Sequence, residues 1–380
     1  MLKTRRRKLR RINRNKSQSK KIVLVIAAIF VLVIFFKLFI QARSIFPIIW
    51  QLVFTHDINL SNTNGRINIL LLGIGGGNHD GPNLTDTIIL ASIDSKNNKI
   101  SLLSIPRDLW IPELGGKINT AYANGQAKQA GDGLVLAKAA IEKVTGQQIN
   151  YGVRLDFNGF VKIVNLVGGL DINVDRTFDD YEYPIDGKEN DNCGHSPDEI
   201  AKLASSSSQL TTFPCRYMHI HFNAGLMHMD GATALIYVRS RHALGVEGSD
   251  FARSRREEKV IAALKSKILS VQTLINPEQV INLYNALKAS IDTDIPSDKF
   301  DDFIRLGEKL KHAKIQSFVI DEGDAIQNRP GLLTNPTSDL AEYNYAWVLI
   351  PRIGNGRYLE IQNYTNCVFT KSNCQVSKSP

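Results

Sequence analysis

The segment from residue 237 to residue 258 concentrates positive charge in a way that suits phosphate chemistry. Five arginines lie in it, with only two acids, Glu247 and Asp250, among them. Guanidinium groups stay charged and bind phosphate oxygens bidentately, so such a cluster favours a diphosphate-binding site. The alternative is a solvated helix whose arginines pair with Glu257 and Glu258. The five arginines are Arg239, Arg241, Arg253, Arg255 and Arg256.

The spacing of these arginines sorts four of them into two pairs. Arg239 and Arg241 are two residues apart, so in an extended segment both side chains point to one face. Arg253 and Arg256 are three apart, so on a helix they share a face. The glycine-containing loop between the pairs allows them to converge. Because four guanidiniums in one place repel one another, convergence predicts an anion among them.

Aspartates at the ends of predicted strands are candidate metal ligands and bases. Asp86 precedes the predicted strand 87–94, and Asp94 is the last residue of that strand. An extended strand separates the two side chains by about 26 Å, so both bind one ion only if the chain bends. Asp86 and Asp108 lie at the ends of neighbouring strands and are better placed to meet. Carboxylates with water ligands suit Mg²⁺, and the alternative for each acid is a helix cap or a turn.

A glycine cluster follows the first predicted strand. It consists of Gly73, Gly75, Gly76 and Gly77, and no Gly-Lys-Ser/Thr follows, so it is not a P-loop. Asn78 stands where a dinucleotide fingerprint has its third glycine. A permissive turn and a phosphate cradle are the two remaining interpretations.

The net charge of +9 comes from the N-terminus of the chain. Residues 1–21 contain eleven Lys or Arg and no acid, and subtracting these charges leaves −2 for the rest. The basic balance therefore gives no support to a nucleic-acid-binding domain, and no nucleic acid partner is expected. The basic tail is instead predicted to contact anionic lipids of the inner leaflet.

An apolar run after the basic tail predicts a single membrane-spanning helix over residues 22–41. Its length suits a bilayer, and Lys37 near its outer end can snorkel to the interface. The alternative is a cleaved signal peptide. The positive-inside rule places the N-terminus in the cytoplasm and the rest of the chain outside the cell membrane.

Four cysteines fit an external location. An even number outside the cytoplasm predicts two disulfides, and four cysteines allow three pairings. The favoured pairing joins Cys193 to Cys215 and Cys367 to Cys374, because each bond closes a local loop. A zinc site built from all four is the alternative, although the chain lacks a close C-x-x-C pair.

The apolar pattern predicts a layered α/β/α domain around a central mixed sheet. Runs that are apolar throughout favour a sheet covered on both faces. The Asn97–Asn98 turn predicts a hairpin, and residues 175–222 are predicted to be an irregular, disulfide-stapled insertion. Strands are predicted at 67–75, 87–94, 99–106, 151–157, 170–174, 315–320 and 345–350. Helices are predicted at 120–145, 158–167, 230–237, 253–270, 277–290 and 297–310.

Six motifs in order and spacing resemble the LytR-CpsA-Psr family over residues 66–270. They are TDTIILASID, SIPRDLWI, KINTAYANG, VRLDFNGFVKIVNLVGGLDINV, DGATALIYVRSR and DFARSRREEKV. The resemblance implies an α/β fold with a hydrophobic tunnel for a polyprenyl chain. It also implies Mg²⁺-aided transfer of a glycopolymer, such as a teichoic-acid-like polymer or capsular polysaccharide, from a polyprenyl diphosphate carrier to peptidoglycan. Helices 158–167 and 259–268 are candidate tunnel walls or ordinary core.

The resemblance implies a role for each matching residue. The metal-associated positions are Asp86 and Asp94. The implied diphosphate ligands are Arg107, Lys117, Arg239, Arg241, Arg253 and Arg256. The implied catalytic set is Asp86, Asp108, Arg239 and Arg241, with either aspartate as the base. Asn119 and Asp250 match the Lys-Ile-Asn and Asp-x-x-Arg-x-x-Arg motifs.

Two departures from the family pattern keep other functions open. Leu84 replaces an arginine, and Glu257 replaces a glutamine, where it either weakens diphosphate binding or pairs with Arg253. The alternatives to transfer are a pyrophosphatase and a non-catalytic binder of lipid-linked polymer.

The expected domain organisation places one catalytic domain after the membrane anchor. A tail (1–21) and span (22–41) precede an interfacial segment and linker (42–65). A catalytic domain (66–320) and a C-terminal extension (321–380) follow.

Overall fold

The computed structural model describes residues 58–77, 81–203, 209–268, 290–324, 328–338, 340–371 and 374–377. The predicted tail and span at 1–21 and 22–41 lie outside these residues, as does nearly all of the predicted helix 277–290. Within the described ranges, no helix combines the length and the apolar character needed to cross a bilayer.

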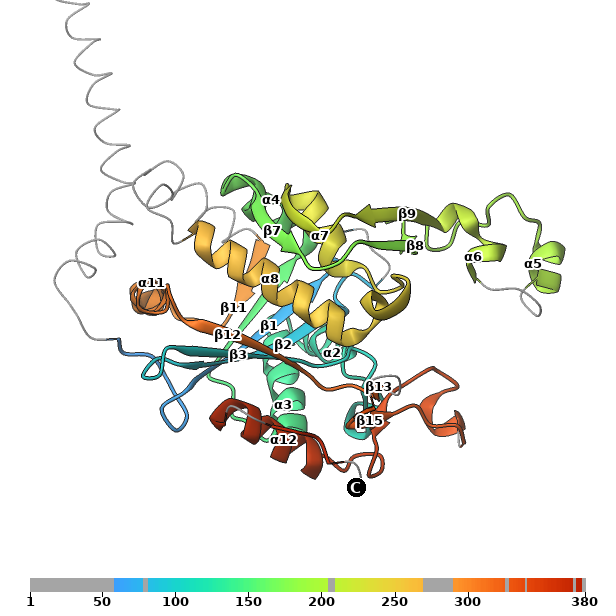
Figure 1. The fold of residues 1–380 in the computed structure, drawn as a ribbon. Helices are drawn as coiled ribbons and strands as arrows, with labels where there is room; N and C mark the ends of the chain where they lie inside the picture. The colour runs from blue at the N-terminus through green and yellow to red at the C-terminus, as the bar shows by residue number, and fades with distance from the viewer. Residues whose placement is uncertain are drawn as a thin grey trace, which may run out of the picture. The chain divides into compact units, whose positions relative to one another are not determined.

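A six-stranded mixed sheet lies at the centre of the compact unit formed by Asn59–Lys299 and Leu306–Pro380 (Figure 1). The strand order is β11-β6-β1-β2-β3-β12. Neighbours β1–β2, β2–β3 and β6–β11 are antiparallel, whereas β1–β6 and β3–β12 are parallel, which confirms the predicted mixed sheet. The strands are β1 (Ile67–Ile74), β2 (Thr85–Asp94), β3 (Lys99–Ser104), β6 (Tyr151–Asp156), β11 (Ile291–Thr293) and β12 (Lys314–Val319).

The central strands form where the sequence is apolar throughout. Most of β1, β2 and β3 is buried, as expected for strands covered on both faces. The predicted hairpin joins β2 to β3, and Asn98 adopts the left-handed φ of 54° that a tight turn requires. The strand predicted at 315–320 is confirmed as the edge strand β12.

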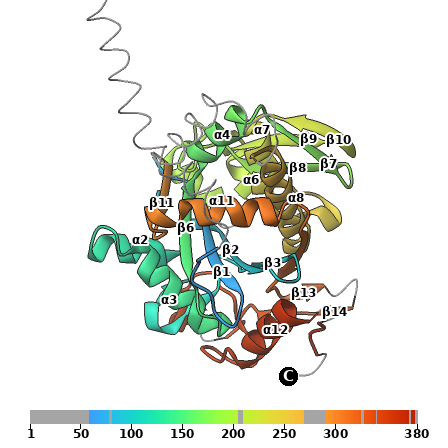
Figure 2. The same ribbon diagram turned by 90° about the vertical axis from the view of Figure 1, so that its left-hand side faces the viewer.

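One face of the sheet packs against α2 (Thr120–Lys128), α3 (Gly133–Thr145) and α12 (Leu359–Thr370). Figures 1 and 2 show α3 and α12 together on this side. The core between them includes Leu70, Leu90, Leu103, Ile141 and Val368, none of them more than 2% exposed. Because α12 is part of this core, residues 321–380 extend the same compact unit and do not form a separate one.

The other side of the sheet carries α4 (Phe157–Leu166), α7 (Gly231–Arg239) and α8 (Asp250–Ile268), as Figure 1 shows. These helices and the pair β7 (Leu170–Val174) and β10 (Gly225–Met229) enclose a second core cluster. Aspartates begin two of the helices: Asp156 accepts from the Gly159 N–H at 2.7 Å, and Asp230 accepts from the Thr233 N–H at 2.8 Å. The layered α/β/α architecture is therefore confirmed.

The segments predicted at 120–145 and 175–222 differ from the structure. The helix predicted at 120–145 is two helices, α2 and α3, because the chain turns between them at Gly131, whose φ is 100°. The insertion predicted as irregular contains the hairpin of β8 (Phe178–Pro184) and β9 (Tyr217–Phe222). The sequence of β8, FDDYEYP, is mostly polar, and Tyr181 and Pro184 are exposed. The segment therefore lacks the apolar pattern by which a strand is predicted.

Both predicted disulfides are confirmed. Cys193 is bonded to Cys215, and Cys367 to Cys374. The zinc alternative is wrong, because all four sulfur atoms are used in these bonds. The first disulfide lies in the segment that joins β8 to β9, which also contains α5 (Pro197–Leu203) and α6 (Gln209–Thr212).

Short elements complete the described fold. The strand predicted at 345–350 is wrong over most of its length: only β16 (Ile350–Pro351) pairs, with β15 (Leu333–Thr334), and Leu349 makes an isolated bridge to Leu109. The helix predicted at 297–310 is confirmed as a 3₁₀ turn, Ser297–Lys299, followed by α11 (Phe300–Lys309). The remaining strands are β4 (Trp110–Ile111), β5 (Gly116–Lys117), β13 (Gly323–Asp324) and β14 (Arg329–Pro330), and the other 3₁₀ turns are Pro112–Leu114, Pro214–Arg216, Gly245–Gly248 and Leu340–Tyr343.

Candidate functional site

A cavity of about 470 Å³ gathers charged side chains from four separate stretches of the sequence. They come from the start of β2, the loop after β3, the end of α7 and the first turn of α8. The cavity is lined by the guanidiniums of Arg107, Arg239, Arg241 and Arg253 and by the carboxylates of Asp86, Asp108 and Asp250. Of the four arginines predicted to converge, Arg239, Arg241 and Arg253 line the cavity, and Arg256 does not.

Asp86 and Arg107 meet at one wall of the cavity as an ion pair. The backbone of Asn119 ties their two segments together: its N–H donates to the Arg107 carbonyl at 3.3 Å, and its carbonyl accepts from the Thr85 N–H at 3.1 Å. Asn119 therefore acts through its backbone, and holds Asp86 beside Arg107.

Asp108 lies among three cations. Lys117 Nζ is 2.7 Å from Asp108 Oδ1, while Arg107 Nε and Arg241 Nη2 lie 3.6 and 3.9 Å from Oδ2. Lys117 reaches this carboxylate because β4 and β5 pair, which sets Lys117 opposite Trp110. The Asp108 side chain is 13% exposed, so these cations offset much of the cost of removing the charge from water.

Arg239 is the last residue of α7, and its surroundings fix its position. Its guanidinium donates to both oxygens of Asp186, at 3.1 and 3.3 Å, and lies 4.4 Å from the centre of the Phe157 ring. The prediction that Arg239 and Arg241 lie in one extended segment is wrong. Arg239 is still helical, and Arg241 lies two residues later, beyond the end of α7. Both still line the cavity.

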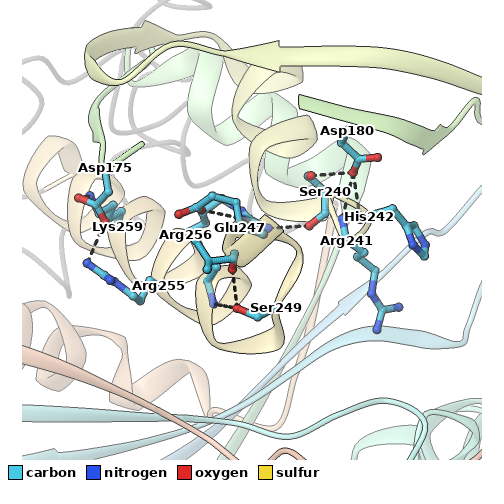
Figure 3. Close-up of polar contacts among 12 residues, drawn as sticks. Asp175, Asp180, Ser240, Arg241, His242, Glu247, Ser249, Arg255, Arg256 and Lys259 are labelled. Carbon is cyan, nitrogen blue, oxygen red and sulfur yellow. Dashed lines mark hydrogen bonds and ion pairs between the residues drawn. The ribbon is translucent and has the colours of Figure 1, made fainter. Parts of the chain in front are cut away.

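The buried carboxylate of Asp180, on β8, holds the turn that presents Arg241. Its Oδ2 accepts from the Ser240 hydroxyl at 2.7 Å and from the backbone N–H groups of Arg241 and His242, each at 3.2 Å (Figure 3). Figure 3 shows the Arg241 side chain directed away from Asp180. Asp180 is 0% exposed, so it acts on the turn and not on a ligand.

The cavity is electrostatically prepared for an anion at Arg241. Burial, followed by repulsion from Arg253 and Arg107, lowers the pKa of Arg241 to about 10. Arg253 itself forms an ion pair with Asp250 at 2.8 Å. A bound anion relieves both the burial cost and the repulsion, which gives a phosphate group a favourable position here.

Arg256 is not a diphosphate ligand in this arrangement. Its side chain is 2% exposed and donates to the carbonyls of Ser240 at 2.7 Å and Glu247 at 2.9 Å, as Figure 3 shows. The predicted common face of Arg253 and Arg256 is therefore split: Arg253 lines the cavity, and Arg256 joins the end of α7 to the loop before α8. Arg255 also lies outside the cavity lining and pairs with Asp175 at 3.0 Å.

Asp94 lies at the opposite end of β2 from Asp86 and is not part of this site. Strand β2 runs continuously from Thr85 to Asp94, with one register shift against β1 at Asp86, so the two aspartates stay at opposite ends of the strand and do not meet at one ion. Asp94 instead pairs with Arg66 at 3.2 Å and accepts from the Asn97 N–H at 3.0 Å. Hydrogen bonds from Asn97 and the charge of Arg66 outweigh partial burial and lower the pKa of Asp94.

The glycine cluster and the two departures from the family pattern lie outside the cavity lining. Gly76 has a φ of 66°, and a Cβ there would lie 2.9 Å from that of Asp156, so this glycine serves the turn interpretation. Leu84 donates its N–H to the Gly81 carbonyl within the loop before β2. Glu257 is buried and accepts from Ser104 at 3.1 Å.

Three residues at the site could not be found from the sequence pattern. Asp180 and Asp186 lie in a segment that the sequence presents as irregular, and nothing in their spacing indicates contact with the arginines. Trp347 lines the cavity from the C-terminal segment, for which the sequence predicted a strand and no function.

An α/β domain with a cavity that combines four arginines with three aspartates belongs to the class of proteins that bind phosphorylated substrates. The chain belongs to the LytR_cpsA_psr family, whose sequence model matches residues 50–343. The predicted family is thereby confirmed, and the match includes every charged residue that lines the cavity.

Curated relatives share about two thirds of their length with this chain. The polyisoprenyl-teichoic acid--peptidoglycan teichoic acid transferase TagU of Bacillus cereus is 27% identical over 253 residues, which cover 65% of this chain and 66% of that protein. The TagU of Enterococcus faecalis is 27% identical over 266 residues, which cover 68% and 69%.

Solved structures confirm the fold. The crystal structure of TagV from Bacillus subtilis superposes with a TM-score of 0.51 at 22% identity, and the match covers 82% of this chain and 100% of that one. A protein of Streptococcus agalactiae gives a TM-score of 0.52 at 21% identity, covering 82% and 91%. The mixed α/β fold with a central sheet is therefore shared.

Proposed function

We propose that this chain is a membrane-anchored phosphotransferase that moves a glycopolymer from a polyprenyl diphosphate carrier to peptidoglycan. The observation that carries the proposal is the cavity in which Arg107, Arg239, Arg241 and Arg253 converge. A diphosphate supplies the negative charge that these guanidiniums require. The curated relatives are named for teichoic acid transfer, so a teichoic-acid-like polymer or a capsular polysaccharide is the proposed cargo.

The proposed reaction is attack of a peptidoglycan hydroxyl on the phosphorus that bears the glycan. The new bond joins the hydroxyl oxygen to that phosphorus, and the bridging P–O bond breaks, so polyprenyl monophosphate leaves. Guanidiniums at the cavity wall stabilise the charge that grows on the transferred and the leaving phosphates. The hydroxyl proton passes to a carboxylate, for which Asp86 and Asp108 are the candidates at the cavity.

Asp86 and Asp108 are the residues that we propose hold Mg²⁺. Both carboxylates line the cavity, and a metal with carboxylate and water ligands is the arrangement that Mg²⁺ prefers. When bound, the ion neutralises diphosphate charge. Asp86 pairs with Arg107 and Asp108 with Lys117, so charge on the metal would release these cations toward the substrate.

The polyprenyl chain is proposed to leave the cavity past Val238. This side chain lines the cavity and also packs on the second core cluster. Partly buried apolar side chains of α4 and α8, including Phe160, Leu264 and Ile268, border the same cluster. An apolar path of this kind is the proposed lipid tunnel, with residues 22–41 as the anchor that keeps the domain on the outer face of the cell membrane.

Transfer is tested with the full-length protein in detergent micelles. The substrates are a polyprenyl diphosphate glycan labelled in its sugar, peptidoglycan strands and Mg²⁺. The proposal predicts label covalently attached to peptidoglycan. Label released into solution as free glycan phosphate supports the pyrophosphatase alternative, and intact lipid that co-purifies with the protein supports a non-catalytic binder.

A further inference from the structure

The C-terminal segment around residue 347 is joined by backbone hydrogen bonds to the loop after β3, which contains Asp108, and to β4. The Leu349 N–H donates to the Asp108 carbonyl at 3.0 Å, and the Trp110 N–H donates to the Leu349 carbonyl at 2.8 Å. The side-chain amide of Asn335 also donates to the Val348 carbonyl at 2.7 Å. This segment lies after residue 343, where the family match ends, yet it is fixed to a residue of the site.

Trp347 is presented at the cavity and not packed into the core. Its neighbours Val348 and Leu349 are 0% and 2% exposed, whereas Trp347 is 56% exposed and lines the cavity with Arg239 and Arg241. The other tryptophan of this region, Trp110, is 5% exposed and stacks edge-on against a tyrosine. A singly exposed apolar side chain is ordinary, so the relevant observation is that this indole lies in the lining of the charged cavity, where it offers an apolar face to a ligand.

We propose that Trp347 forms a sugar subsite for the first saccharide of the lipid-linked glycan. A pyranose ring has an apolar C–H face that covers an indole well, while its hydroxyls stay in water or reach polar side chains such as His242. The sugar is attached directly to the diphosphate and must therefore lie next to the arginines, and Trp347 lines the same cavity as they do. This inference rests on the proposed function. It adds a sugar-binding residue, Trp347, that lies after the segment matched by the family model.

Binding of two lipids by the full-length protein in detergent micelles, without peptidoglycan, tests the subsite. One lipid is a polyprenyl diphosphate without sugar, and the other is a polyprenyl diphosphate N-acetylhexosamine. The variants are Trp347→Ala, Trp347→Phe and, as a matched control, Tyr345→Ala, which removes an 80% exposed aromatic that does not line the cavity.

The subsite predicts that Trp347→Ala raises the Kd for the sugar-bearing lipid about tenfold and leaves the Kd for the bare lipid unchanged. Trp347→Phe retains part of the sugar effect, and Tyr345→Ala binds both lipids like the wild type. Equal Kd values for the sugar-bearing lipid in Trp347→Ala and wild type overturn the subsite but leave the proposed function standing.

Two further outcomes also overturn the assignment. If Trp347→Ala raises the Kd for both lipids equally, the indole contacts the polyprenyl diphosphate and not the sugar. If only the KM for peptidoglycan changes in a transfer assay, the indole serves the acceptor. Failure of the wild type to bind either lipid removes the proposed function, and the subsite with it, so the two failures are distinguishable.

Discussion

The buried carboxylate of Asp180 accepts a hydrogen bond from the backbone N–H of Arg241 at 3.2 Å, and so fixes the turn that presents this guanidinium to the cavity. The same oxygen accepts from Ser240 and His242. These contacts join the β8–β9 hairpin, far away in the sequence, to the end of α7. The position of the cavity arginines therefore depends on a residue that does not line the cavity.

Replacing Asp180 should damage both stability and turnover. Asp180→Ala leaves a hydroxyl and the N–H groups of Glu182, Arg241 and His242 without their acceptor, and we expect a loss of about 2–4 kcal/mol in the free energy of unfolding. Urea denaturation measures this loss. Asp179→Asn is the control, because Asp179 is exposed and contacts His219 and His221 instead. Similar losses for both variants would contradict the role of Asp180.

Arg241 should not tolerate lysine. A lysine keeps the charge but loses the planar fork that binds two phosphate oxygens, so we expect Arg241→Lys to lower kcat/KM at least about tenfold. Arg255→Lys is the matched control, because Arg255 pairs with Asp175 outside the cavity lining and should retain activity. The kinetics of transfer give the comparison, and equal losses in the two variants would refute the assignment.

Arg256 should contribute to the stability of the fold and not to ligand binding. Arg256→Met leaves the Glu247 carboxylate and the Ser240 carbonyl without their partner, and removing one member of a buried ion pair costs about 3–5 kcal/mol. A thermal unfolding series that includes Glu247→Gln and the double variant isolates the coupling between the two residues. A fully stable Arg256→Met protein that has lost lipid binding would instead restore Arg256 as a ligand.

Glu257 should make the protein less stable as pH rises. Burial raises the pKa of Glu257, so the folded state holds its proton more tightly than the unfolded state. Stability is therefore lost as pH rises from the ordinary carboxyl pKa through the raised one. We expect Glu257→Gln to have the higher Tm at pH 8 and the same Tm as wild type at pH 4.

The opposite sign is expected at Glu360. Hydrogen bonds from Arg352 lower the pKa of the Glu360 carboxyl, so this group stabilises the fold above its ordinary pKa. Glu360→Gln should lower the Tm at pH 8 and leave it unchanged well below the lowered pKa. For Glu257, the result that would contradict the prediction is a Tm of Glu257→Gln below that of wild type at pH 8.

The Mg²⁺ concentration that transfer requires should depend on Asp86 and not on Asp94, the other aspartate of β2. EDTA should abolish transfer, and Asp86→Asn should raise the Mg²⁺ concentration needed for half-maximal activity. Asp94→Asn should leave that concentration unchanged and affect only the Tm, because Asp94 pairs with Arg66 and the Asn97 turn. A Mg²⁺ titration of the two variants decides, and an unchanged requirement in Asp86→Asn would count against this aspartate as a ligand.

The fold could be predicted from the sequence where apolar residues repeat without interruption. Strands β1, β2 and β3 were predicted to within a few residues because each is buried on both faces. The β8–β9 hairpin was missed because polar and exposed residues interrupt its buried ones, which makes a strand resemble a polar loop. The break between α2 and α3 depends on the conformation of Gly131, which helix periodicity does not reveal.

The site could be predicted for residues whose chemistry is visible in the sequence. Arg241 and Asp108 have side chains that suit phosphate and metal, and their motifs placed them together. Arg256 has the same chemistry as Arg253, and only packing shows that one is buried and the other lines the cavity. Trp347 comes from a distant segment, and its position follows from two backbone hydrogen bonds that no local pattern indicates.

The central claim is that phosphorus moves with the glycan, and the position of the broken bond tests it most directly. Full-length protein is incubated with peptidoglycan and a polyprenyl diphosphate glycan labelled with ³²P in the phosphate next to the sugar. The account predicts labelled phosphodiester on peptidoglycan and an equal amount of unlabelled polyprenyl monophosphate, both formed at least about tenfold more slowly by Arg241→Lys. Unlabelled glycan on peptidoglycan with release of labelled polyprenyl diphosphate would contradict it.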